Sequence, residues 1–508
     1  MNVAQFLEHW GVQENPFRAE EARRDEVFAR LAGASGPGAE HSDFEKVLGD
    51  LRRPATSIVF GEKGSGKTAI RLQMASRIRA HNAKAERDKI LLVAYDDLNQ
   101  FLDQLHERLG AQDAIASLEQ LRLSDHLDAM LSIAVTKVVD GLLGAPAGEE
   151  GLDLSREARR ALRRSDRALR RDIALLQAMY DRSPLAEQRS ALVRRALGLG
   201  PPPRRMLWTA LALLGWLLPA AAGAAWWHFG QLRAEPVWWG AVGGAAAVWG
   251  LILLKRAALD PWRLRRRARR LRRRLRALGR SERSLARSLT QVNPRLMEGP
   301  LAPLSDTDES RYAMLARLRE FLAPIGYAGL IILVDRVDEP TLVRGDPRAM
   351  QAVIWPLLSN TFLQQEGLGV KLLLPIELRH ALFKESSAFF QEARLDKQHL
   401  IERLLWTGSM LYDLCEARLR SCRKPDAEPV ALVDLFAEDV AQRDVVDALD
   451  QMRQPRDAFK LLYQCMLEHC SNVTTADDDW RIPRLTLEAV RKREVDRVHQ
   501  LARGIRPA

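Results

Sequence analysis

The 508-residue sequence predicts an α/β fold: a parallel sheet, interrupted by a long helical insertion and followed by a helical C-terminal domain. Three observations predict it. Short apolar runs that are followed by acidic or turn residues recur at 56–60, 89–97 and 329–340, as expected of buried parallel strands. The segments around them keep the spacing of amphipathic helices. Two much longer apolar stretches, 206–227 and 237–254, lie inside the insertion.

The N-terminal segment predicts short helices before the first strand. Residues 6–11 form a helical pattern that stops at Asn15-Pro16, because a residue before proline avoids the helical region. A charged amphipathic pattern predicts a helix over 18–33. Glycine-rich residues 33–38 predict a loop, and residues 41–51 a helix that leads to the strand.

Residues 61–68 match the pattern G-x-x-x-x-G-K-[ST] in full, as Gly61-Glu62-Lys63-Gly64-Ser65-Gly66-Lys67-Thr68. A strand, a glycine-rich turn and a helix point backbone N–H groups and a helix N-terminus at one spot, which suits the phosphates of ATP. We predict that these residues and Ala69 bind the nucleotide. Lys67 would contact the β- and γ-phosphates, and the Thr68 hydroxyl would coordinate Mg²⁺. The alternative is a chance glycine turn before a helix.

After the next strand, 89–97, the alternation of strand and helix stops. Residues 101–143 keep helical spacing, and residues 154–199 form an arginine-rich amphipathic helical pattern. The sequence therefore predicts a helical insertion at this point.

The stretches 206–227 and 237–254 each approach the length that crosses a bilayer, and the short polar link 228–236 separates them. Eight of the twelve tryptophans lie in or beside them, several at the ends, where interfacial aromatic residues belong. We predict a transmembrane hairpin in contact with inner membrane lipid. The alternative is a pair of buried helices in a soluble core.

Basic residues flank the hairpin on both sides. Arg204 and Arg205 precede the first span, Lys255 and an arginine run follow the second, and Arg233 lies between them. The positive-inside rule then predicts a bacterial inner-membrane protein with two spans and with both termini and the nucleotide domain in the cytoplasm. Gly240 and Gly244 form a small-xxx-small pair that would seat a neighbouring helix.

Residues 255–287 carry a net charge of +13, so the rest of the chain sums to −2 out of a total of +11. Leucine and alanine recur there in a heptad stripe up to Leu289, interrupted at Glu282, which predicts a basic helical stalk that extends the second span. The basic coat has three interpretations: attraction to anionic lipid, nucleic-acid binding, and a solvated face that fixes topology. The stretch lacks the interleaved aromatic residues typical of single-strand binding, so nucleic acid is possible but not favoured.

The third apolar run, 329–340, ends in Asp335, which is the Walker B pattern. An acid at the carboxyl end of a parallel strand lies beside the glycine-rich loop, so Asp335 is the second predicted Mg²⁺ residue. Asp338 and Glu339 follow, and one of them, with Glu339 favoured, would orient and deprotonate the attacking water. The alternative is an apolar strand followed by surface acids.

Three later segments carry further candidates. The apolar run 370–379 predicts a strand whose Glu377 or Arg379 would sense the γ-phosphate; the alternative is a plain strand end without a sensor. A strand is also predicted over 399–406. Arg394 is a candidate arginine finger if subunits meet there, or a structural ion-pair partner. Arg456, which follows a proline at a helix start, is a candidate nucleotide sensor, although a proline there needs no function.

Two resemblances extend this interpretation. Asn15-Pro16-Phe17 before the strand and Pro455-Arg456 at a late helix resemble AAA+ and STAND ATPases, and the spacing Asp335-x-x-Asp338-Glu339 resembles STAND proteins. A transmembrane insertion between the two Walker motifs resembles the KAP-type P-loop NTPases. These usually have Asp-Asp at Walker B, from which Asp335-Arg336 departs. The resemblance implies a P-loop NTPase core and an Arg456 that senses nucleotide.

The function expected from these observations is a membrane-anchored ATPase, a switch or motor that couples ATP to the hairpin in bacterial signalling or antiphage defence. The alternatives are a slow or non-hydrolysing ATP-gated scaffold that recruits a membrane partner, and a nucleic-acid-stimulated ATPase. A homo-oligomer or a partner membrane protein is expected. The expected domains are 1–100 (first part of the core), 101–205 (helical insertion), 206–254 (hairpin), 255–320 (basic stalk and return helices), 321–425 (second part of the core) and 426–508 (C-terminal helical domain).

Overall fold

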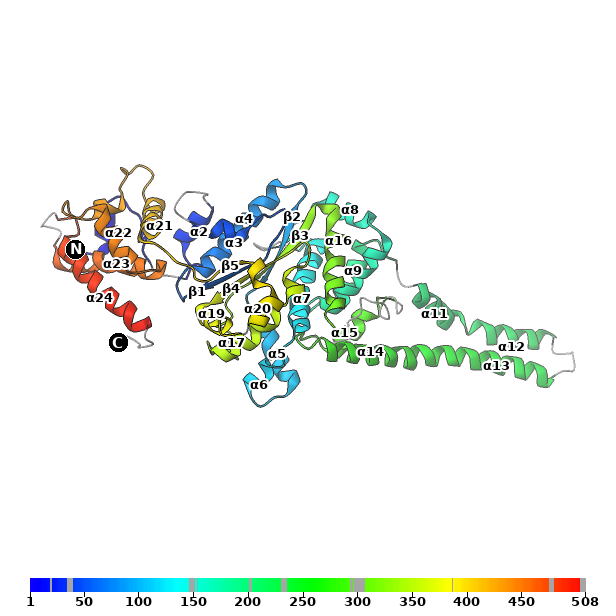
Figure 1. The fold of residues 1–508 in the computed structure, drawn as a ribbon. Coiled ribbons are helices and arrows are strands. Elements are labelled where there is room, and N and C mark those ends of the chain that lie inside the picture. Colours follow the sequence, from blue (N-terminus) through cyan, green and yellow to red (C-terminus); the bar gives the residue numbers. More distant parts are fainter. Residues whose placement is uncertain are drawn as a thin grey trace. The chain divides into compact units, whose positions relative to one another are not determined.

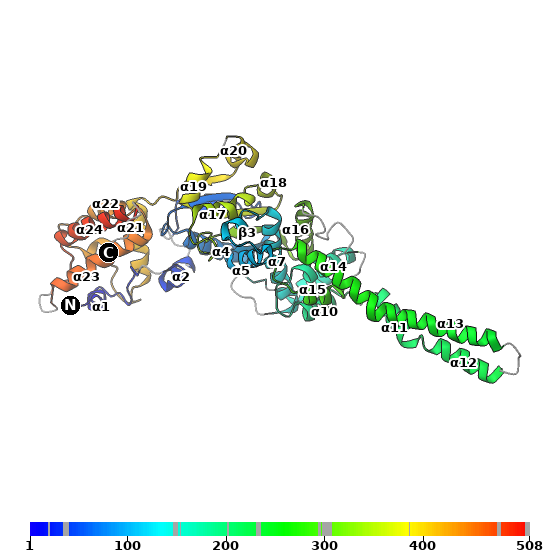
Figure 2. The same cartoon turned by 90° about the horizontal axis from the view of Figure 1, so that it is seen from below.

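The computed structural model confirms the α/β fold with a parallel sheet and a largely helical remainder. The chain divides into two compact units, of which unit 1 comprises Met1–Asp97 and Gly329–Ala508, and unit 2 comprises Leu98–Ala328. Figures 1 and 2 show the elements of both. The structure describes residues 1–18, 21–33, 40–145, 151–152, 154–200, 203–229, 235–292, 296, 307–385, 387–474 and 479–502.

The sheet of unit 1 has five strands in the order β2-β3-β4-β1-β5. Its central strands are buried along their whole length, which explains why they are apolar without alternation. β1 lies parallel to β4 on one side and to β5 on the other, and β4 lies parallel to β3. The strands are β1 (Ser57–Gly61), β2 (Lys89–Tyr95), β3 (Tyr327–Val334), β4 (Leu368–Pro375) and β5 (His399–Ile401).

Two predicted strands are shorter than expected. The strand predicted over 370–379 ends at Pro375, and Glu377 and Arg379 lie in the helix that follows it. The strand predicted over 399–406 ends at Ile401, and the helix predicted over 18–33 begins only at Glu26. The helices of unit 1 are α1 (Val3–His9), α2 (Glu26–Gly33), α3 (Phe44–Leu48), α4 (Lys67–Lys84), α17 (Pro347–Ile354), α18 (Asn360–Leu363), α19 (Ile376–Leu382), α20 (Ser387–Ala393), α21 (Gly408–Ser421), α22 (Gln442–Asp450), α23 (Pro455–Asn472) and α24 (Arg484–Ala502).

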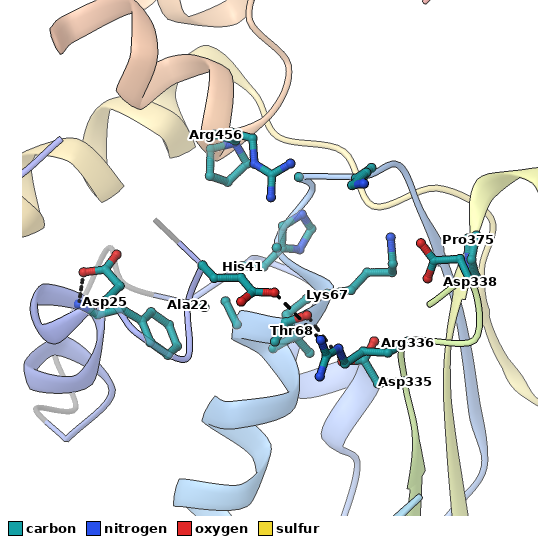
Figure 3. Close-up of a pocket in the computed structure, with 18 of the residues that line it drawn as sticks. Ala22, Asp25, His41, Lys67, Thr68, Asp335, Arg336, Asp338, Pro375 and Arg456 are labelled. Atoms are coloured by element: carbon teal, nitrogen blue, oxygen red, sulfur yellow. Dashed lines mark hydrogen bonds and ion pairs between the residues drawn. The ribbon is translucent and has the colours of Figure 1, made fainter. Parts of the chain in front are cut away.

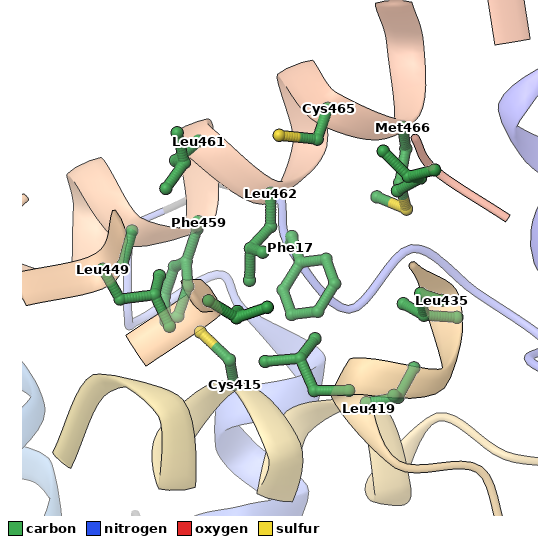
Figure 4. Packing of buried hydrophobic residues seen from close by; sticks show 14 of the residues in the cluster. Phe17, Cys415, Leu419, Leu435, Leu449, Phe459, Leu461, Leu462, Cys465 and Met466 are labelled. Atoms are coloured by element: carbon green, nitrogen blue, oxygen red, sulfur yellow. The ribbon is translucent and has the colours of Figure 1, made fainter. Parts of the chain in front are cut away.

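The C-terminal helices have a hydrophobic core of their own, in which Phe17 from the N-terminal segment packs with residues of α21, α22 and α23 (Figure 4). Cys415 and Cys465 lie in this core as free, buried thiols, and burial raises the pKa of Cys415 to about 12. They therefore act as small apolar side chains.

Lys371 is a charged residue type in the centre of β4, and its side chain is fully buried. Its Nζ donates hydrogen bonds of 2.8 Å to the carbonyls of Val47 and Ala55, which flank the loop before β1. No carboxylate pairs with it among the ion pairs of the described residues, and burial lowers the pKa of Lys371 to about 7. A neutral amine has two N–H donors, which these two carbonyls accept.

Unit 2 is helical. A fully buried polar cluster links three of its helices: Arg311 forms an ion pair with Asp128 at 3.1 Å, and the Tyr180 hydroxyl donates to the same carboxylate at 2.7 Å. The helices are α5 (Asn99–Leu109), α6 (Ala114–Leu118), α7 (Leu123–Leu143), α8 (Arg156–Arg164), α9 (Arg167–Tyr180), α10 (Ala186–Ala196), α11 (Pro203–Leu214), α12 (Leu217–Phe229), α13 (Glu235–Leu254), α14 (Asp260–Arg274), α15 (Glu282–Leu289) and α16 (Glu309–Leu322), with a π-helical turn, Lys255–Leu259, between α13 and α14.

The two long apolar stretches form helices that are long and apolar enough to cross a membrane, Met206–Ala225 and Trp239–Arg274. Only 11% and 0% of their most apolar windows are buried, so neither is a core helix of the described protein. α12 and α13 lie side by side in both views (Figures 1 and 2). The Trp249 indole donates to the Ala212 carbonyl at 3.1 Å and so links α13 to α11.

The helical path of the first apolar stretch is interrupted by a short turn within Met206–Ala225, because α11 ends at Leu214 and α12 starts at Leu217. Pro219 has no N–H for the carbonyl of Gly215, which instead accepts from Leu218 at 3.3 Å in a tighter turn. A side chain at Gly215 would also lie 2.7 Å from Trp249.

The continuous stalk predicted up to Leu289 is wrong, because α14 ends at Arg274 and α15, which contains Leu289, packs back against it. Arg108 donates to the carbonyl of Arg272, in the last turn of α14, and to the carbonyls of Leu275 and Leu278, which follow it. The Arg272 carbonyl is one of those that a helix end leaves without an intrahelical partner.

Candidate functional site

The loop between β1 and α4 contains the predicted motif, and its backbone needs glycine at two positions. Gly64 has φ of +99° and Gly66 has φ of +95°, values that side chains disfavour. α4 then begins at Lys67. The first turn of a helix carries N–H groups without intrahelical partners, so this turn favours an anion.

Lys67 is folded back onto the loop that precedes it. Its Nζ donates to the carbonyls of Gly61 at 2.7 Å and Glu62 at 2.9 Å. Burial lowers the pKa of Lys67, and the carboxylates of Asp335 and Asp338 oppose this effect. Two of the three N–H donors of the ammonium are thus engaged by carbonyls, and an anion would compete with these carbonyls for Lys67.

Asp335 follows the last residue of β3 and is 1% exposed. The Thr68 hydroxyl donates to Asp335 Oδ2 at 3.4 Å, so the two predicted metal-binding residues lie side by side although the whole of unit 2 separates them in sequence. Burial raises the pKa of Asp335, an effect that Arg71 and Lys67 oppose. Arg71 forms an ion pair with Asp96, at the end of β2, at 2.8 Å.

A cavity of about 300 Å³ opens at this point (Figure 3). Predicted residues that line it are Lys63, Gly64, Gly66, Lys67, Thr68, Ala69, Asp335, Asp338, Glu339, Glu377 and Arg456. Gly61, Glu62 and Ser65 belong to the same loop but do not line the cavity. Arg379 points to Glu402 instead, at 2.6 Å, and Arg394 caps a short 3-10 turn outside the cavity.

Two contacts from later segments hold the glycine-rich loop. The Glu62 carboxylate pairs with Arg403 through one oxygen and accepts from the Gln454 side chain through the other. The Trp406 indole donates to the Ser65 carbonyl at 2.8 Å.

Several cavity residues are not among the predicted site residues. Arg336, between Asp335 and Asp338, is one of them. Glu21 and His41 come from the N-terminal segment, and Trp406 comes from the segment after β5. His41 is buried against Trp406, and its ring nitrogens contact the Leu405 carbonyl at 2.8 Å and the Asp43 N–H at 3.0 Å. No local sequence signal indicates contacts between segments so far apart.

The cavity lining combines cationic, hydroxyl and carboxylate side chains. Among the described residues, no three His, Cys, Asp or Glu side chains are grouped to hold a metal ion. The hydroxyl of Thr68 and the carboxylate of Asp335 instead offer the hard oxygen donors that Mg²⁺ prefers when phosphates complete its shell.

Comparison of the chain with protein-family models, with curated proteins and with solved structures finds no match.

Proposed function

We propose that this protein is a membrane-anchored, Mg²⁺-dependent ATPase of the P-loop type. The observation that carries the proposal is the meeting of Thr68, at the start of α4, with Asp335, at the end of β3, beside Lys67. A glycine-rich loop, a lysine, a hydroxyl and a buried acid at the carboxyl edge of a parallel sheet are the parts that phosphoryl transfer needs.

Each residue has a role in this proposal. The backbone of residues 61–69 holds the phosphates, and Lys67 contacts the β- and γ-phosphates. Thr68 and Asp335 hold Mg²⁺, which supplies charge neutralisation when it is bound. Glu339 or Asp338 orients the attacking water and accepts its proton. Arg456, on the opposite wall, contacts the nucleotide.

The hairpin anchors the protein in the membrane. We propose that α11–α12 and α13 span the bacterial inner membrane and that both termini lie in the cytoplasm, which gives the nucleotide site access to ATP. Unit 2 is inserted between β2 and β3, and Asp335 directly follows β3. A rearrangement around Asp335 would therefore act on the chain segment that leads to the hairpin. The KAP-type resemblance fits this layout, and the pathway would be bacterial signalling or antiphage defence.

One contact favours a second candidate, a slow or gated ATP-dependent scaffold. Glu339, the favoured base, forms an ion pair with Arg336. A base that is held by a guanidinium is less available to accept a proton, so basal turnover would be low.

The test is purification in nanodiscs, followed by measurements of mass, of ADP and ATP binding and of phosphate release. The parent protein should bind ATP and release phosphate in the presence of Mg²⁺. The Lys67→Ala variant should do neither. Tight binding with negligible turnover would favour the scaffold. Equal turnover by Lys67→Ala and the parent would refute the proposal.

A further inference from the structure

Arg336 has an unusual backbone conformation at the wall of the cavity. Its φ is +61°, in the left-handed region that glycine and asparagine usually occupy. Five described non-glycine residues have a positive φ, and Arg336 is the one among these five that lines the cavity. Lys67 and Thr68 line the same cavity. Such conformations gather at functional sites, where the surrounding structure imposes them.

The guanidinium of Arg336 is placed between two carboxylates. It pairs with Glu339, and the Glu21 carboxylate lies 3.9 Å away. Both carboxylates line the same cavity, and the side chains of Glu339 and Glu21 are 44% and 51% exposed. Exposed pairs of this kind are weak, so an incoming anion can compete for Arg336.

We propose that Arg336 is a phosphate-binding residue that distinguishes ATP from ADP and that holds Glu339 until the third phosphate arrives. The inference rests on the proposed nucleotide site. A γ-phosphate carries more negative charge than one carboxylate and accepts two parallel N–H bonds from a guanidinium. Arg336 therefore leaves Glu339 for the phosphate, and the freed carboxylate orients the attacking water. ADP lacks that phosphate, so Glu339 stays paired.

The backbone and charge contributions of Arg336 can be separated, because glycine accepts the same φ. Arg344 provides a matched control. It lies in the same segment, has φ of +49°, is exposed and does not line the cavity. Arg336→Gly and Arg344→Gly therefore make the same chemical change at two left-handed positions.

The experiment measures the dissociation constants of ADP and of a non-hydrolysable ATP analogue with the purified full-length protein. Arg336→Gly should lower the affinity for the ATP analogue about tenfold, which is the contribution of a hydrogen bond to a charged group. Its affinity for ADP should stay within about twofold of that of the parent. Arg344→Gly should match the parent for both ligands.

A second arm uses Glu339→Gln, which removes the competing charge. The analogue should bind several-fold more tightly to Glu339→Gln than to the parent, and this gain should vanish when Arg336→Gly is added. An unchanged ratio of ADP to analogue affinity in Arg336→Gly overturns the inference, as does a gain that persists without Arg336. If the parent binds neither ligand, the proposed nucleotide site fails instead. ADP binding by each variant reports that it is folded.

Discussion

The indole N–H of Trp406 donates a 2.8 Å hydrogen bond to the carbonyl of Ser65, in the centre of the glycine-rich loop. Trp406→Phe keeps most of the packing and removes the bond, at a cost of about 1 kcal/mol. We expect weaker ATP binding by about fivefold, measured by titration of a fluorescent analogue. Trp355→Phe is the control, because the Trp355 indole donates to Glu385 away from the cavity. Equal losses in both variants would contradict the role of Trp406.

The Glu62–Gln454 contact joins the loop to the start of α23. Gln454→Leu leaves Glu62 with Arg403 as its charged partner and frees the loop from that helix. ATP affinity should fall about fivefold, again from the loss of about 1 kcal/mol. Gln451→Leu makes the same change at an exposed position nearby and should have no effect. Parent-like affinity in Gln454→Leu would show that the loop holds its shape without this contact.

Lys371 predicts a pH dependence of stability. Its pKa is about 7 in the folded protein, whereas a lysine exposed to water has a pKa of 10.5, so between these values the unfolded chain binds a proton that the folded chain lacks. The free energy of unfolding should therefore rise as the pH rises from 7 to 10.5, by up to about 1.4 kcal/mol per unit. Lys371→Met should remove this rise and leave two carbonyls without their partner. Thermal unfolding at several pH values measures this change in stability. An equal dependence of stability on pH in the parent and in Lys371→Met would exclude Lys371 as its cause.

Removing one partner of the buried ion pair between Arg311 and Asp128 should destabilise unit 2 more than removing the charges of both. Arg311→Met leaves a buried carboxylate without its cation, which costs about 3–5 kcal/mol. Adding Asp128→Asn should recover part of the loss, since no unpaired charge remains. Midpoints of thermal unfolding compare the variants. A double variant less stable than Arg311→Met alone would contradict this account.

The basic coat of α14 predicts anionic lipid as its partner. Arg265, Arg266, Arg270 and Arg273 are exposed and follow the apolar helix closely. Changing all four to Gln should reduce the anionic phospholipid that copurifies with the protein, because each contributes about 1 kcal/mol near a charged surface. The control changes four exposed arginines of α8, namely Arg156, Arg160, Arg163 and Arg164. If the amount of copurified lipid is unchanged and the four-residue variant loses salt-sensitive DNA binding, nucleic acid is the partner of the basic coat instead.

The sequence was most informative where a local pattern determines the structure. An apolar run followed by an acidic residue predicts that Asp335 lies at the end of a strand. Because parallel strands end at the same edge of a sheet, the pattern also predicts that Asp335 lies near Thr68. Long-range contacts had no such signal. Trp406 and Gln454 reach the loop only because their segments fold beside it. The stalk prediction failed because the heptad stripe continues past Arg274, whereas the helix ends there and Arg108, on another helix, binds carbonyls at and beyond that end. Pro219 was a local signal for the break in the first span.

The ends of the insertion have a consequence for how this chain is built. β2 and β3 are neighbours in the sheet, and residues 96–326 connect them. Adjacent parallel strands need only about a dozen residues to join them. The sheet therefore has no topological need for unit 2, which takes the place of an ordinary crossover. A short crossover could therefore join the same two strands without a change in strand order.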